Sequence, residues 1–94
     1  MDSHALNVSR GQQLHFAADG NAINGIIVDS KRAFGTTASV TVEVESAVAE
    51  GAQLTMPNLN CGGCGSAHPV SRNGHTTIEI SIPYGHIDLS TIGT

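Results

Sequence analysis

The sequence contains no tryptophan, one tyrosine and only two phenylalanines among its 94 residues. Aromatic side chains form the platforms on which proteins usually stack bases and sugar rings, so their scarcity argues against a stacking site for either ligand. The hydrophobic core must come instead from Val, Ile, Leu and Ala, which pack well but provide few large anchors.

Charge is also scarce, and positive charge most of all. Charged residues make up 13% of the chain, compared with about 25% in an average soluble domain. Four Lys and Arg residues stand against eight Asp and Glu residues, and the net charge is −4. The four cations form no basic run, and binding to phosphates needs clustered cations. We therefore expect no nucleic-acid partner. A surface so poor in charge favours packing against other proteins.

Long hydrophobic runs are missing as well. No apolar stretch approaches the roughly 18 residues that cross a bilayer, and the first residues, MDSHALNVSRGQQ, lack the basic and apolar regions of a secretory signal. We therefore expect no membrane partner and synthesis in the cytoplasm without a signal peptide. Later incorporation into a virion or another particle is left open.

A chain of this length has room for one domain, 1–94, with a single thin core. The clearest pattern in it is strict alternation of apolar and polar residues, which is typical of a strand with one buried face. Two segments show it, SVTVEVES (39–46) and TTIEISIP (76–83). The residues predicted to face the core are Val40, Val42, Val44, Ile78, Ile80 and Ile82.

Weaker strand candidates lie between turn residues, at 5–9, 13–17, 23–29, 53–56 and 86–92. Asp19-Gly20 and Asn73-Gly74 tolerate the positive φ that tight hairpins require. One-sided strands need a second layer or a closed sheet to bury their apolar faces. We therefore predict an all-β fold, a small single-domain β-sandwich or barrel of about seven short, mainly antiparallel strands.

Two segments fit more than one structure. Asn24-Gly25 interrupts an apolar run and fits either a turn or a β-bulge. The segment 43–50, EVESAVAE, has the Ala and Glu content of a short helix. Its alternation continues to Val48, however, and we therefore predict a strand that runs past Ser46.

A long Cys- and Gly-rich loop is predicted at 57–74, and loops of this length are usually functional or held by a crosslink. It contains Cys61 and Cys64 in a C-x-x-C pair, the spacing at which two thiolates bind one zinc ion. His68 and His75 complete a set of four ligands of suitable types. We therefore predict a metal site at these four residues, with zinc as the cofactor and no other cofactor indicated.

Other interpretations of the two cysteines stay open. A disulfide would close a small ring, would add modest stability and would be unusual in a reducing cytoplasm. A redox pair needs a helix that lowers the thiol pKa, whereas Pro69 and several glycines follow the pair. The cysteines are alternatively two inert thiols in a tight loop.

Catalytic motifs are missing from the sequence. Nucleophilic catalysis needs a Ser or Cys beside a His that a carboxylate orients. The only local pairing is Cys64 or Ser66 with His68, and no acidic residue is close to them in the sequence. Glu43 and Glu45 share one strand face and are interpreted as solvated surface. We therefore expect no enzyme, with no catalytic and no cofactor-binding residues. A small thiol-dependent enzyme is a further alternative.

The remaining features predict a structural role. We expect a non-enzymatic interaction module, a small accessory subunit of the decoration or cement type, which docks on a larger protein assembly such as a viral capsid or forms a homo-oligomer. Exposed sheet edges or the terminal arms would pair with a neighbouring subunit, and the loop at 57–74 would form a contact. The alternative is a zinc-stabilised binding module in which the Cys61, Cys64, His68 and His75 loop recognises the partner.

Overall fold

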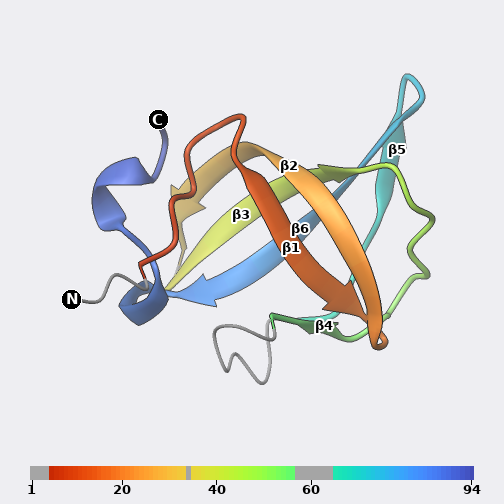
Figure 1. Ribbon diagram of the computed structural model, residues 1–94, viewed down its shortest axis with the longest axis horizontal. Coiled ribbons are helices and arrows are strands. Elements are labelled where there is room, and N and C mark those ends of the chain that lie inside the picture. Colours follow the sequence, from red (N-terminus) through yellow and green to blue (C-terminus); the bar gives the residue numbers. More distant parts are fainter. Residues whose placement is uncertain (1–4, 34, 57–64) are drawn as a thin grey trace.

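The computed structural model describes residues 5–33, 35–56 and 65–94. They form one all-β domain in which six antiparallel strands build a single curled sheet, a half-barrel (Figure 1). The strand order across the sheet is β4-β1-β2-β3-β6-β5. The predicted all-β class is confirmed, as one curled sheet. The strands are β1 (Gln13–Ala18), β2 (Asn21–Arg32), β3 (Thr37–Val44), β4 (Leu54–Thr55), β5 (Val70–Arg72) and β6 (His75–Pro83).

The core lies on the inner face of the sheet. Alternate residues of β3 and β6 face it, and the antiparallel register places Val40 beside Ile80 and Val42 beside Ile78. All four side chains are buried. β-branched residues suit these positions because they pack well on a pleated surface, and burying each contributes about 1.5–3 kcal/mol. Both strands predicted from strict alternation are confirmed.

Tight hairpins join β1 to β2 and β5 to β6. Asp19 and Gly20 have φ of 49° and 83°, and Asn73 and Gly74 have φ of 55° and 80°. Positive φ at both central residues is the condition for a type I′ turn, whose twist matches that of the flanking strands. Both predicted turns are therefore confirmed.

Asn24 and Gly25 form neither a turn nor a bulge but lie inside β2. A Cβ at Gly25 would lie 2.1 Å from Cγ1 of Val42 and 3.3 Å from Cγ1 of Val44. The glycine is therefore required because two valine side chains of β3 occupy the space where its own side chain would be.

A β-bulge in β2 decides which residues face the core. The register with β3 shifts between Ile27 and Asp29, which makes Val28 the extra residue. Buried positions are odd-numbered before this point and even-numbered after it. Ser30 consequently points into the core, while Val28 lies exposed on the outer face. In the sequence, the three consecutive apolar residues at 26–28 interrupt the alternation of apolar and polar residues and mark the position of the bulge.

Two predicted segments have other boundaries. Residues 45–50 form neither strand nor helix: β3 ends at Val44, although β2 and β6 both continue beyond the residues that pair with it. The predicted loop at 57–74 is interrupted, because Val70–Arg72 form β5 and pair with β6. Residues 57–64 lie outside the described part of the chain.

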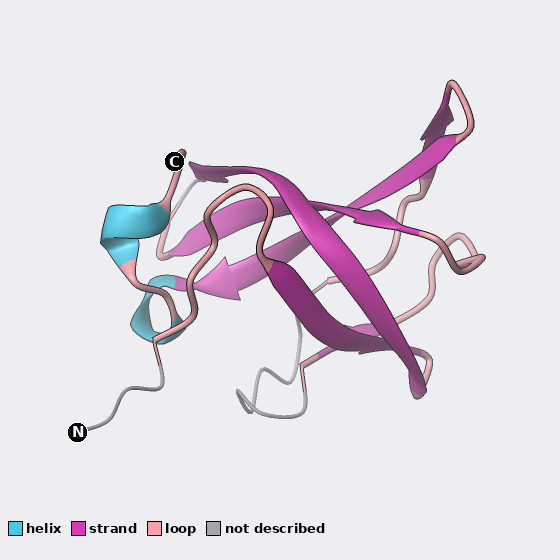
Figure 2. Ribbon diagram, turned by 45° about the horizontal axis from the view of Figure 1, so that its top comes forward, coloured by secondary structure: helices cyan, strands magenta, loops and turns pink. Residues whose placement is uncertain are grey.

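The predicted strand at 86–92 is wrong. Tyr84–His86 form the single-turn 3-10 helix η2 and Leu89–Thr91 form η3 (Figure 2). The Asp88 carboxylate accepts hydrogen bonds from the backbone N–H and the hydroxyl of Ser90, which favours a local turn over a ladder. The predicted strand at 5–9 is reduced to a bridge between Leu6 and Ile87. No helix in the described part of the chain is long and apolar enough to span a membrane.

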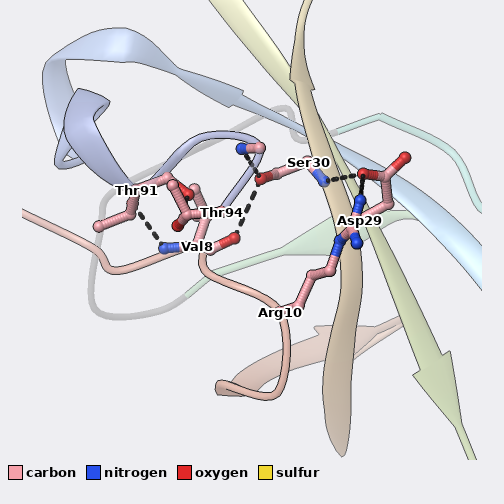
Figure 3. Close-up of polar contacts among 7 residues, drawn as sticks. Val8, Arg10, Asp29, Ser30, Thr91 and Thr94 are labelled. Carbon is pink, nitrogen blue, oxygen red and sulfur yellow. Dashed lines mark hydrogen bonds and ion pairs between the residues drawn. The ribbon is translucent and has the colours of Figure 1, made fainter.

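The first and last described segments hold each other at one end of the sheet (Figure 3). The Ser30 hydroxyl donates to the carbonyl oxygen of Val8 at 3.0 Å and accepts from the N–H of Gly93 at 2.9 Å. The N–H of Val8 donates to Oγ1 of Thr91 at 3.0 Å. We call Val8, Ser30, Thr91 and Gly93 the terminal clasp. Its hydrogen bonds are all made within the chain.

The edges of the sheet are only partly covered. β4 has two residues and pairs only with Ala17 and Ala18 of β1, and β5 has three and pairs only with residues 75–77 of β6. The segment before β5 also bonds to the chain around β4: the N–H of Ala67 donates to the carbonyl of Ala52 at 2.7 Å. Within the described residues, 13–16 of β1 and 78–83 of β6 have a strand partner on one side only, and such backbone is open to strand addition. The outer face of the sheet is a second candidate for an interaction surface.

Candidate functional site

A groove crosses the outer face of β3, β6 and β5, and we call it the outer groove. Its volume is about 840 Å³, within the range of about 300–1,000 Å³ typical of ligand sites. Outward-facing Thr41 of β3 and Thr77 of β6 line it together with Glu43 and Glu79 of the same strands, because the sequence neighbours of these residues face the core. The strand order puts the bulge of β2 on one side of them and β5 on the other.

Three exposed apolar side chains lie on this face. Of the four large apolar side chains that are exposed in the described ranges, Val28 and Val70 line the outer groove from opposite sides, and Ile26 pairs with Glu43 of β3. Their exposed fractions are 37% for Val28, 43% for Val70 and 41% for Ile26. Because β3 and β6 lie between Val28 and Val70, these two are separate apolar points of one groove and not a continuous patch.

A histidine and a carboxylate meet across two strands at this groove. Nδ1 of His75 lies 2.6 Å from Oε2 of Glu43. The register explains the contact, because Glu43 pairs with Thr77, and His75 lies two residues earlier on the same face of β6. The Glu43 side chain is only 38% exposed. Glu43 is therefore more than solvated surface: it orients the imidazole and leaves Nε2 as the ring atom available to a ligand.

A second histidine in the groove has its own carboxylate. Nδ1 of His68 lies 2.7 Å from Oε2 of Glu50. The hydrogen bond and the negative charge of Glu50 raise the pKa of His68 above its ordinary value of 6.5. Glu50 is thus the carboxylate that contacts His68; it lies 18 residues away in the sequence, so the search for an acidic residue near His68 did not find it. Ser66 also lines the groove, but no hydrogen bond joins it to His68 within the described residues.

The predicted metal ligands are only partly placed by the structure. His68 and His75 both line the outer groove, as does Gly65, the residue directly after Cys64. Cys61 and Cys64 lie outside the described residues. Within residues 5–33, 35–56 and 65–94, no three His, Asp or Glu side chains are arranged to hold a metal ion. A complete site would therefore need the cysteines.

Two charged side chains of the groove have no ionic partner. Arg72 on β5 and Glu79 on β6 line it, and neither takes part in any ion pair of the described chain. Both are exposed. Sequence reasoning missed them, together with Val28, because only the strand register and the bulge bring them to one face.

Comparisons with protein-family models, with curated proteins and with solved structures found no match.

Proposed function

We propose that the protein is a non-enzymatic interaction module that docks on a larger protein assembly, of which a viral capsid is one example, through the outer groove. The observation that carries this proposal is the exposure of Val28 and Val70 on opposite sides of one groove that threonines and glutamates line between them. Each valine is already more than half buried, so covering it contributes about 1 kcal/mol. Hydroxyl groups between them can exchange water for a partner's polar groups at low cost.

The chain as a whole is poor in charge, with 13% charged residues, a composition that suits packing against other proteins. The outer groove carries Glu43, Arg72 and Glu79, so it suits a partner with complementary charges better than a purely apolar one. Val8 and Gly93, near the two ends of the described chain, are engaged in the terminal clasp. We assign docking to the outer groove because it combines a concave shape with exposed apolar side chains.

Site-specific photo-crosslinking tests the proposal. A photoreactive amino acid replaces Thr77 in the groove or, as the control, Asn21 in the exposed β1–β2 turn, and the protein is expressed in its source cells. We expect crosslinks from position 77 to one protein of a larger, sedimenting assembly, and none from position 21. Equal crosslinking from both positions, or a free monomer with no crosslinks, would rule out docking through the groove.

A zinc-stabilised binding module is the second candidate, and one observation favours it. His68 and His75 each hold a carboxylate through Nδ1, which is the arrangement that orients metal-binding histidines and leaves Nε2 for the metal. With Cys61 and Cys64 they would form the predicted site, in which zinc stabilises the loop that contacts the partner.

Metal content decides between the two candidates. Protein purified without chelator should contain about one zinc per chain by elemental analysis if the site exists, and EDTA should lower its Tm. The Cys64→Ser variant should lose most of the metal, while Ser90→Ala, in η3 and not among the residues that line the groove, should keep it. Zinc-free protein whose Tm is unaffected by EDTA would eliminate this candidate.

A further inference from the structure

Arg72 and Glu79 line the outer groove at two different positions along the direction of β6. The distance between these positions limits which ligands can contact both charges. Arg72 pairs with His75 in the register of β5 and β6, at the hairpin end of the groove. Glu79 lies four residues further along β6, beside Thr41 of β3. At a rise of about 3.3 Å per residue, the two rows are about 13 Å apart.

Between the positions of the two charges, paired residues of β5 and β6 present an apolar side chain and a hydroxyl group. Val70 pairs with Thr77, which in turn pairs with Glu43. The carboxylate of Glu43 is already engaged by His75 at 2.6 Å. His68, the remaining titratable group that lines the groove, is likewise engaged by Glu50 at 2.7 Å. Arg72 and Glu79 are therefore the charged side chains of the groove that have no hydrogen-bonded partner within the described residues, and Val70 and Thr77 lie between them.

We infer that the outer groove binds an extended polypeptide segment of the partner in which an acidic and a basic residue are four positions apart, with an apolar residue midway. This inference rests on the proposed docking function and names the chemistry of the docked segment. The acid faces Arg72 and the base faces Glu79. In an extended chain, residues i and i+4 are separated by about 13 Å and point to the same side, which matches the spacing of the two rows.

Shape and charge both favour such a segment. A concave surface needs a convex occupant, and one extended strand is narrow enough to lie over the threonines between Val28 and Val70. Complementary charges at two points fix the register of the segment and exclude segments of one sign, because opposing like charges would be left in contact.

Three synthetic peptides test the inference against the whole protein. Each has seven residues and capped ends, with valine at the fourth position and threonine elsewhere, except for positions two and six. These carry Asp and Lys in the mixed peptide, two Asp in the acidic peptide and two Lys in the basic peptide. Binding is followed by NMR chemical-shift titration. The mixed peptide matches both charges of the groove, whereas each of the other peptides matches only one. The wild-type protein should therefore bind the mixed peptide with a Kd about two- to fivefold lower than that of the acidic or the basic peptide.

Charge reversal should move the preference in a stated direction. Arg72→Glu makes both charges of the groove negative, so this variant should prefer the basic peptide. Glu79→Lys makes both positive, so this variant should prefer the acidic peptide. Both residues are exposed, and unchanged melting curves will show that the variants fold. Gln13→Lys, at an exposed position of β1, serves as a charge control that should keep the wild-type preference.

The inference is overturned if the peptides bind equally or not at all, or if the two reversals leave the preference unchanged. It is also overturned if the protein self-associates in sedimentation experiments and the reversals abolish that association, because the occupant is then a second copy of the chain. If the peptides fail to bind but position 77 still crosslinks specifically to a partner, this inference alone is refuted and the docking function stands. Failure of the crosslinking removes the docking function itself.

Discussion

Replacing Ser30 by alanine should destabilise the protein far more than its small size suggests. The Ser30 hydroxyl is the only buried polar side chain in the described ranges, with 3% of the residue exposed, and it joins the carbonyl of Val8 to the N–H of Gly93. Val8 is completely buried, so no water can take the place of the lost donor at its carbonyl oxygen.

The expected loss follows from these two groups. A buried backbone group left without a hydrogen bond costs about 1–3 kcal/mol. Gly93 is exposed and water can reach its N–H, so it adds little. We therefore expect Ser30→Ala to lower the free energy of unfolding by about 2 kcal/mol, which corresponds to about 8–16 °C in Tm for a domain of this size.

Urea unfolding measures this loss, and a neighbouring serine provides the control. Ser9 contacts Oγ1 of Thr94 at 3.0 Å in an exposed position, so Ser9→Ala should change the free energy of unfolding by less than about 0.5 kcal/mol. The m-values of both variants should equal that of the wild type. If Ser30→Ala proves as stable as Ser9→Ala, the terminal clasp does not hold the fold together and the reasoning is refuted.

Two further substitutions test the packing of β2 and the electrostatics of the groove. Gly25→Ala should cost about 1–3 kcal/mol in urea unfolding, because its Cβ would lie 2.1 Å from Cγ1 of Val42; a variant as stable as the wild type would contradict the close approach of β2 and β3. Glu50→Gln should lower the pKa of His68 toward 6.5, because Glu50 raises it, as NMR titration of the imidazole would show. The stabilising contact with Glu50 should be fully present below the ordinary pKa of His68 and should be lost as pH rises through the raised pKa; an unchanged pKa in the variant would disprove it.

The parts of the fold that could be predicted are those that local pattern determines. Strict alternation identified the inward valines of β3 and isoleucines of β6, since a period of two places every second side chain on one face. Asp19-Gly20 and Asn73-Gly74 identified two hairpins, because few other residues adopt positive φ at both turn positions.

The rest depended on contacts between distant residues. The bulge at Val28 exchanges the faces of β2 beyond it, so sequence alternation alone could not show that Ser30 is buried. Similarly, 32 residues separate His75 from Glu43 and 18 separate His68 from Glu50. Histidines 68 and 75 were identified from their spacing to the cysteines, whereas their glutamate partners follow only from the register and the path of the chain.

The bridge between Leu6 and Ile87 makes the chain almost a ring. The first described segment and the last one lie at the same end of the sheet, away from the β5–β6 hairpin (Figure 1). A short peptide that joins Ala5 to Thr94 in place of residues 1–4 would close the ring covalently and reduce the entropy of the unfolded chain. The chain could then be opened at Asn73-Gly74 instead, as circular permutation is tolerated at exposed turns. In the permuted protein, new ends would lie beside the outer groove, where a fused segment could compete directly with a docked partner.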